Sequence, residues 1–413
     1  MTAVAAPAVG ASIRLSQALS FGQEQAMLLE AATAFCRDQS PVSAVRARMG
    51  TEHGFDRAVW DAMVALGWSG LAVPESLGGS GLTLAEAATI SEPMGRHLLA
   101  TPFAATQLFV QGVLAGGSAA QQAVWLPPVC GGAIGTVALF ERDGDWTLED
   151  IEARAARAGA SVKLEGMKML VPDAAVADAL LVSVMLEGAP ALALVHRDQL
   201  GAQALQRETV IDETRRSYQL DLTGIEVPAA ALIEGVAALN ALAAVRRAAW
   251  LLASAEAAGG MAGVLDVVVD YLNTRTTFGR KIGSYQSLKH TCADMLVSME
   301  RSRSHVYHCA TLITEGAQPQ ALEVALRMAK VESGDGFVFA GDRAVQFHGG
   351  FGFTWDCDAQ LFLRRALWLQ HSFGDAAHHR RRLADLLLPH EDTGRLHGSR
   401  RAGGGQSAVS KNG

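Results

Sequence analysis

Two short segments in the C-terminal half hold side chains suited to binding a phosphate-bearing dinucleotide. Arg275 follows a long apolar stretch, and a guanidinium can contact a pyrophosphate through two N–H groups at once. Gln286 and Gln346 carry amides that both donate and accept hydrogen bonds, as an adenine edge or a ribityl chain requires. Gly349 and Gly350 have no Cβ, so the backbone there can approach a ligand closely. Each feature alone is ordinary for a helix end or a turn, and the combination favours a dinucleotide site.

The elements that must position these residues fall into three zones of hydrophobic periodicity. Apolar residues recur at helical spacing in residues 15–130, alternate with a period near two in 131–235, and return to helical spacing in 236–390. We therefore predict a mainly α protein in which an antiparallel β-barrel or sandwich domain separates two helical domains. Residues 1–14 and 391–413 lack this periodicity and are predicted to be disordered.

More local patterns support this division. Residues 238–273 contain no proline and are apolar nearly all round, which predicts a long central helix buried on several sides. Thr83 precedes Glu86 by three residues, the spacing of a helix-capping box. In the central zone the turns are too short for crossover helices, which excludes a Rossmann sheet. The predicted strands there lie at residues 162–166, 179–185, 191–196 and 218–222.

Two motifs give the chain a family resemblance. Residues 275–290 match the pattern R-x-x-F-G-x-x-I-x-x-x-Q-x-x-x-H, and residues 346–353 match Q-x-x-G-G-x-G-F. With the stretch 66–82 and the helical–β–helical order, they make the chain resemble the acyl-CoA dehydrogenase family over about residues 15–388. The resemblance implies that family's fold, with a C-terminal four-helix domain, and FAD as cofactor. The FAD contacts that it implies are Arg275, Phe278, Gln286, Gln346, Gly349 and Gly350.

In the family, residues of the Arg275, Gln346 and Gly349–Gly350 types bind the FAD of a neighbouring subunit. The resemblance therefore implies at least a dimer.

The chain departs from this family where the catalytic base is expected. The family reaction is α,β-dehydrogenation of an acyl thioester, in which a carboxylate removes the α-proton and the flavin accepts a hydride. Counting from the glycine pair, the usual glutamate position falls on Phe373, and the alternative position on the long helix falls on Ala249. The arginine that follows the alternative base is replaced by Trp250. The flavin-facing segments also differ, reading VALFERDGD at 137–145 and MLV at 169–171.

Two interpretations of this departure remain open. In the first, another carboxylate is the base: Glu256 lies two helical turns after Ala249 in an apolar segment, and Asp375 is the second candidate. If they are structural instead, Glu256 would pair with Arg246 or Arg247, and Asp375 would cap the following helix.

In the second interpretation, the chain is a base-lacking subunit of a mixed tetramer. It then resembles the bacterial short-chain subgroup that acts on steroid side chains or dicarboxylic acids. A third possibility, a non-enzymatic scaffold, is disfavoured because the FAD-contacting residues persist.

Composition excludes several other classes. The 35 basic and 42 acidic side chains give a net charge of −7, which argues against a nucleic-acid surface. The start of the chain lacks the regions of a secretory signal, and the apolar runs are too short to span a bilayer. Five scattered cysteines indicate free thiols in a reducing cytoplasm, and the pair His305 and His308 has no evident third metal ligand.

We therefore expect a dimeric or tetrameric cytoplasmic bacterial flavoprotein without a metal site. It would act on an acyl-CoA, or complete the site for one, and pass electrons to an electron-transfer flavoprotein.

Overall fold

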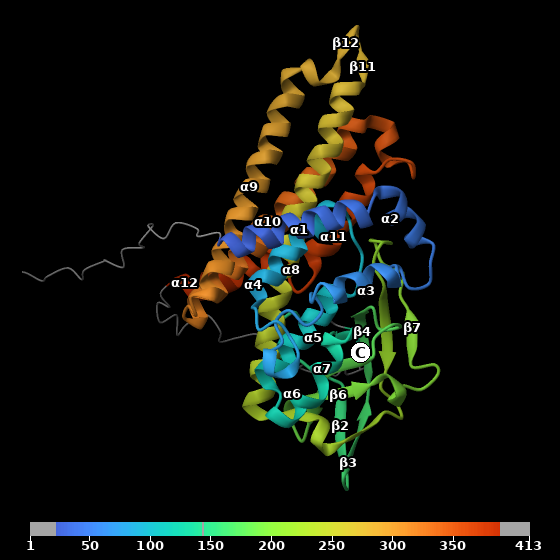
Figure 1. Cartoon of the computed structure of the whole chain (residues 1–413), viewed down its shortest axis with the longest axis vertical. Helices are drawn as coiled ribbons and strands as arrows, with labels where there is room; N and C mark the ends of the chain where they lie inside the picture. The colour runs from blue at the N-terminus through green and yellow to red at the C-terminus, as the bar shows by residue number, and fades with distance from the viewer. Residues whose placement is uncertain (1–21, 143, 389–413) are drawn as a thin grey trace, which may run out of the picture.

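The computed structural model describes residues 22–142 and 144–388, which form a helical region, a β region and a second helical region in chain order (Figure 1). This confirms a mainly α fold with a central β domain. The helical first region ends at Cys130, the β region begins at Gly135, and the second helical region begins at Gly235. The two predicted disordered ends, residues 1–14 and 391–413, lie outside the described residues.

The N-terminal region is built from helices joined by short connections. The predicted capping box is present: the Thr83 hydroxyl accepts a hydrogen bond from Ala85 N at 3.1 Å, and Glu86 Oε2 accepts one from Thr83 N at 2.9 Å. The elements are α1 (Gln23–Gln39), α2 (Val42–Met49), α3 (Arg57–Ala65), η1 (Glu75–Leu77), α4 (Leu84–Arg96), α5 (Phe103–Gly116), α6 (Ala119–Trp125) and α7 (Pro127–Cys130).

The β region consists of a larger and a smaller sheet. The larger has the order β10-β6-β5-β2-β3-β9 with β1 also paired to β5, and the smaller has the order β4-β8-β7. The strands are β1 (Gly135–Ala138), β2 (Arg154–Ala158), β3 (Ser161–Glu165), β4 (Met167–Pro172), β5 (Ala179–Leu186), β6 (Ala189–His196), β7 (Leu205–Arg207), β8 (Ser217–Asp221), β9 (Glu226–Pro228) and β10 (Leu232–Glu234), with η2 (Arg197–Gln199) and η3 (Ala229–Ala231) between them.

The four predicted strands are confirmed as β3, β5, β6 and β8. The prediction of purely antiparallel pairing is wrong at two places, because β1 and β2 each pair with β5 in parallel. Parallel neighbours need a long connection, and the chain between each of these strands and β5 is long enough to provide it.

A single helix organises the C-terminal region. The predicted long buried helix is confirmed as α8 (Gly235–Thr274), with α9, α10 and α11 packed beside it. Its most apolar window is long enough to cross a membrane, but 67% of that window is buried within the protein, as in a core helix. The remaining elements are β11 (Thr276–Thr277), β12 (Arg280–Lys281), η4 (Ile282–Ser284), α9 (Gln286–Thr314), α10 (Pro319–His348), η5 (Gly349–Phe353), α11 (Ala359–His371) and α12 (Ala376–Leu387).

Helices α4 and α8 cross in backbone contact. A Cβ added to Gly259 of α8 would overlap the carbonyl oxygen of Glu92, and one added to Gly95 of α4 would overlap that of Glu256. Both neighbouring atoms belong to helix backbone, so a side chain could be accommodated only by separating the helices. This backbone contact fixes the position of Glu256 along α8 relative to α4.

The crossing predicts a large stability effect for a single methyl group. We expect Gly259→Ala to lower the free energy of unfolding by roughly 1–3 kcal/mol, because the added methyl overpacks a rigid contact. Gly201→Ala is the matched control, since nothing lies within 4 Å of a Cβ at this position. Urea unfolding of both variants would measure the difference, and equal stabilities would contradict the crossing.

Candidate functional site

A cavity of about 430 Å³ lies where the β region meets α5, α8 and the end of α11. Ala249 of α8 and Phe373, which follows α11, both line it. The structure thus brings together the two positions that sequence counting gave for the catalytic base, from opposite ends of the C-terminal region. Neither side chain can accept a proton, and most of the other lining residues are also apolar.

The turn that carries Phe373 is held by a buried lysine. Lys330 Nζ donates hydrogen bonds to the carbonyl oxygens of Leu369, Gln370 and Gly374 at 2.9, 3.0 and 3.1 Å. Burial lowers the pKa of Lys330 to about 7, opposed by the charges of nearby aspartates. Three carbonyl acceptors therefore compensate for the missing water around this ammonium and fix the backbone of the turn.

Phe373 itself is fixed by two aromatic neighbours. Its backbone has a φ of +55°, and its carbonyl accepts a hydrogen bond from Trp250 Nε1 at 2.9 Å. Its ring meets Phe140, from the segment after β1, edge to face with 4.9 Å between centroids. Two of the three replaced positions of the family pattern, 250 and 373, are thus joined by a hydrogen bond.

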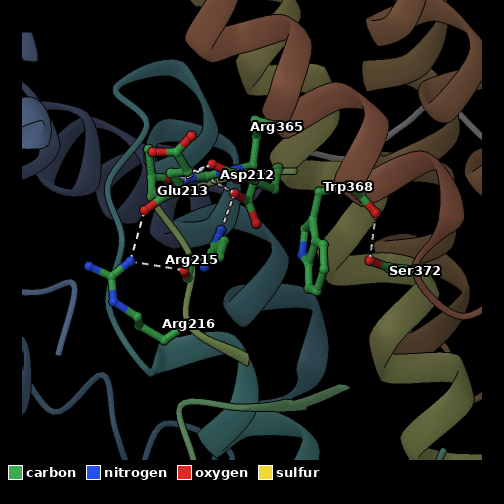
Figure 2. A network of polar contacts seen from close by, with 9 residues as sticks. Asp212, Glu213, Arg215, Arg216, Arg365, Trp368 and Ser372 are labelled. Atoms are coloured by element: carbon green, nitrogen blue, oxygen red, sulfur yellow. Dashed lines mark hydrogen bonds and ion pairs between the residues drawn. The ribbon is translucent and has the colours of Figure 1, made fainter. Parts of the chain in front are cut away.

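Glu256 lies on the cavity wall but is held in a buried network of charges. Figure 2 shows the other charged members of this network, Asp212, Arg215 and Arg365. Its Oε1 accepts hydrogen bonds from Arg215 and Arg365, and Arg365 also donates to Asp212 and Thr214. Burial alone would raise the pKa of Asp212, but the charges of Arg365 and Arg215 hold it below its usual value. The network joins α8, α11 and the 212–215 loop.

The prediction that Glu256 would pair with Arg246 or Arg247 is wrong, because its partners are Arg215 and Arg365. Arg246 instead donates to the carbonyl of Thr147 and lies 3.9 Å from Glu149. It precedes Glu256 by ten residues, about 15 Å along the axis of α8, which is too far for an ion pair. Arg247 makes no recorded contact with Glu256 among the described residues. Asp375, the alternative base, does not line the cavity; its carboxylate accepts from His378 N at 2.7 Å and caps α12, as expected for its structural role.

A smaller and more polar pocket of about 200 Å³ adjoins the cavity. Trp146 lines both, and three arginines line the smaller pocket: Arg246, Arg327 and Arg382. In the run 378–382, the side chains of His378 and His379 are buried, while the three arginines are exposed.

The residues predicted to contact FAD gather at the far end of the C-terminal region. Tyr271 near the end of α8 stacks on His348 at the end of α10, with 4.1 Å between ring centroids. This contact brings Arg275, which follows α8, and the Gly349–Gly350 pair, which follows α10, to the same end of the two helices. Phe278, at the tip of the β11–β12 hairpin, is 91% exposed.

This end is open and distant from the cavity. The side chain of Arg275 has no hydrogen-bond or ion-pair partner among the described residues, and Gln286 and Gln346 are exposed. A Cβ on Gly349 or Gly350 would meet nothing within 4 Å. Ala249 and Thr274 are separated by about 38 Å along α8. The predicted contacts therefore do not reach the cavity of their own chain.

Sequence inspection missed the basic members of the charge network. Arg365 occupies an otherwise apolar stripe with Leu361 and Leu369, four residues apart on α11, and that pattern was the available signal of its burial. Arg215 gave no such signal, because it lies in an irregular segment. The same holds for Asp173, an acidic residue that lines the cavity. Groups of three or more metal-ligating side chains are absent from the part of the chain that the structure describes, and His305 and His308 lie on α9 without a third ligand.

The comparisons with known proteins agree on one family. Residues 22–133 match the model described as acyl-CoA dehydrogenase, N-terminal domain, and residues 236–388 match acyl-CoA dehydrogenase, C-terminal domain. The chain is 28% identical to acyl-CoA dehydrogenase IpdE2 of Mycobacterium tuberculosis over 83% of this chain and 91% of the relative.

Solved structures extend the likeness. A steroid ACAD, the Tcur3481-Tcur3483 variant, is 27% identical with a TM-score of 0.78, over 89% of this chain and 98% of the other. Butyryl-CoA dehydrogenase from Megasphaera elsdenii shares the fold, with a TM-score of 0.80 at 21% identity over 89% and 99% of the chains.

The buried histidine beside the Lys330 turn predicts a pH dependence of stability. Burial, with the charges of Lys330 and Arg327, lowers the pKa of His379 to about 2. The unfolded chain binds a proton near the ordinary pKa of 6.5 while the folded chain does not, so stability is retained above 6.5 and lost as the pH falls toward 2. Between pH 7 and pH 5 this histidine accounts for a loss of up to about 2 kcal/mol.

The matched measurement compares His379→Phe with His53→Phe, since His53 is exposed. Urea unfolding at both pH values should show a smaller loss in His379→Phe than in the parent, and an unchanged loss in His53→Phe. An identical loss in all three proteins would contradict a neutral buried His379.

Proposed function

The chain belongs to the acyl-CoA dehydrogenase family, and from that premise we propose that it is the base-lacking subunit of a heteromeric acyl-CoA dehydrogenase. The observation that carries the proposal is the cavity wall, where Ala249 and Phe373 occupy both customary positions of the catalytic carboxylate. Without a base to remove the α-proton, this cavity can bind an acyl thioester but does not start the reaction.

The other acidic side chains of the cavity support this view. Glu256 is shared by two guanidinium groups, and Glu141 is paired with the buried Lys168 and accepts hydrogen bonds from two backbone N–H groups. Both carboxylates thus compensate for buried positive charge. The carboxylate of Asp173 has no hydrogen-bond partner among the described residues. Asp173 follows β4, however, whereas both customary positions of the base lie elsewhere, on α8 and after α11.

The residues at the far end of α8 fit a role in FAD binding toward another subunit. An unpaired, exposed guanidinium at Arg275 and an accessible backbone at Gly349 and Gly350 suit a dianionic pyrophosphate. FAD, when bound, supplies the two-electron acceptor of the dehydrogenation. The side chains of Gln286 and Phe278 would complete the contact, in a site whose cavity and base belong to the partner.

The pocket beside the cavity would hold the CoA part of a thioester. It is polar and charge-balanced, because Arg246, Arg327 and Arg382 line it together with Glu149, Glu323 and Asp385, and it opens next to the apolar cavity that would hold the acyl group. A relative supports the mixed assembly: the steroid ACAD at 27% identity is named for two chains, Tcur3481 and Tcur3483. Electrons from the completed site would pass to an electron-transfer flavoprotein.

Dehydrogenation by this chain alone is the second candidate function. It is favoured by the position of Glu256, whose side chain lines the same cavity two turns beyond Ala249. In that case Glu256 would act as the base despite its two guanidinium partners. The two candidate functions differ in the role of Glu256, which is structural in a base-lacking subunit and catalytic in a dehydrogenase that acts alone. A conservative substitution of Glu256 distinguishes them.

We expect Glu256→Gln to destabilise the protein without impairing chemistry. Loss of the carboxylate leaves Arg215 unpaired and Arg365 with one acidic partner fewer, and breaking a buried pair typically lowers stability by roughly 3–5 kcal/mol. Urea unfolding measures that effect, and anaerobic flavin bleaching by acyl-CoA measures the chemistry. Bleaching by the isolated parent chain that slows by about two orders of magnitude in the variant would instead identify Glu256 as the base.

We expect Arg275→Ala to weaken FAD binding while leaving the fold intact. The exposed guanidinium makes no contact within the described chain, so its removal should not lower the thermal midpoint. Loss of a charge-assisted contact to pyrophosphate should weaken binding by roughly 1.5–3 kcal/mol. Flavin content of the purified assembly measures this, with Arg301→Ala, the removal of another exposed arginine, as control. Full flavin occupancy in Arg275→Ala would remove this residue from the cofactor site.

A further inference from the structure

One face of α8 connects the arginine-lined pocket to the charge network. Arg246 lines the pocket, and beyond it Ala249, Leu252, Ala253 and Glu256 line the cavity in order along the helix. Ala249 and Glu256 are separated by about 10 Å along the helix axis. A thioester whose CoA part lies in this pocket therefore directs the far part of its acyl group toward Glu256 and Arg215.

The cavity is polar at this far end and has unused hydrogen-bonding capacity there. Arg215 donates to Glu256 through Nη2, while its Nη1 has no partner among the described residues; its Nε also has none but is fully buried, so Nη1 is the donor left for a ligand. Asp173 also lines the cavity, and its carboxylate has no hydrogen-bond partner in the same part of the chain. The backbone N–H of Asp173 donates to the Arg216 carbonyl at 3.1 Å, which holds the residue in place after β4.

The charges at this end are balanced. Arg215, Arg216 and Arg365 face three acidic groups, Asp173, Asp212 and Glu256. Burial raises the pKa of Asp173 to about 6, opposed by the charges of Arg215 and Arg216. A further carboxylate would be buried here without a compensating charge, whereas a neutral oxygen would use the free donors. A purely apolar chain would leave those donors desolvated and unsatisfied.

We propose that the acyl group held in this cavity carries an uncharged oxygen, a hydroxyl or a ketone, on its distal part, and that Arg215 and Asp173 recognise it. The proposal rests on the proposed function in that it takes the cavity to hold the acyl part of a CoA thioester. Arg215 donates to either kind of oxygen, and Asp173 accepts from a hydroxyl. The pair thereby selects oxygenated acyl groups over plain hydrocarbon chains.

The test is a calorimetric titration of the full purified chain with matched CoA thioesters. The probes are octanoyl-, decanoyl- and dodecanoyl-CoA, each compared with its terminally hydroxylated counterpart. At the chain length that reaches Arg215, we expect the hydroxylated ligand to bind about tenfold more tightly or better. Arg215→Leu should abolish this preference and still fold, because Glu256 keeps Arg365 as a partner.

Arg364→Leu is the matched control. It removes another ion pair between α11 and the same loop, Arg364 with Glu213, but does not line the cavity, so the preference should persist. Should Arg215→Leu not fold, Asp173→Gly serves instead: glycine tolerates the φ of +52° at this position, and the preference for the hydroxyl should fall.

The outcomes separate this inference from the proposed function. Equal affinity for each matched pair would overturn the inference while leaving acyl-CoA binding intact. Tighter binding of the mono-CoA thioester of dodecanedioic acid than of the hydroxylated ligand would overturn the choice of an uncharged group. A failure of every CoA thioester to bind would overturn both.

Discussion

The buried charge of Arg365 is the constraint around which the cavity is arranged. Its side chain is 0% exposed, and a guanidinium removed from water requires acidic and hydrogen-bonding partners on all sides. Those partners come from Glu256 on α8 and from Asp212 and Thr214 in a loop of the β region. One buried cation thus ties α11, α8 and the β region together at the point where their meeting leaves a cavity.

The length of α8 is the second constraint, because it separates the cavity from the residues predicted to contact FAD. The same rigid helix carries the cavity wall at Ala249 and ends about 38 Å away beside Arg275. The Tyr271–His348 stack keeps the motif residues together at that end. A ligand contacted by Arg275 therefore cannot also lie against Ala249 of the same chain without spanning the helix, which is the physical reason for proposing a shared site between subunits.

The features predictable from sequence were those with local signals. Periodicity identified α8 and four strands, and side-chain spacing identified the Thr83–Glu86 capping box. The parallel pairing of β1 with β5 had no local signal, because it depends on a long connection. The partners of Glu256 were missed for a similar reason: Arg215 is distant in sequence, while Arg246, on the same helix, lies about 15 Å away along the axis and bonds to the β region. Long-range charge pairing is a property of the assembled fold.

The departures from the family pattern form a set of mutually supporting contacts. Trp250 stands where an arginine is usual, and its indole N–H bonds to the carbonyl of Phe373, which stands where the glutamate is usual. Arg327 lies over the Trp250 ring, with its guanidinium carbon 4.3 Å from the ring centroid, and Phe140 packs on Phe373 from the β region. Restoring a glutamate at position 373 would remove the Phe140 contact and place a carboxylate beside an apolar wall. The apolar side chains at positions 250 and 373 are therefore part of the packing around the cavity and not isolated replacements.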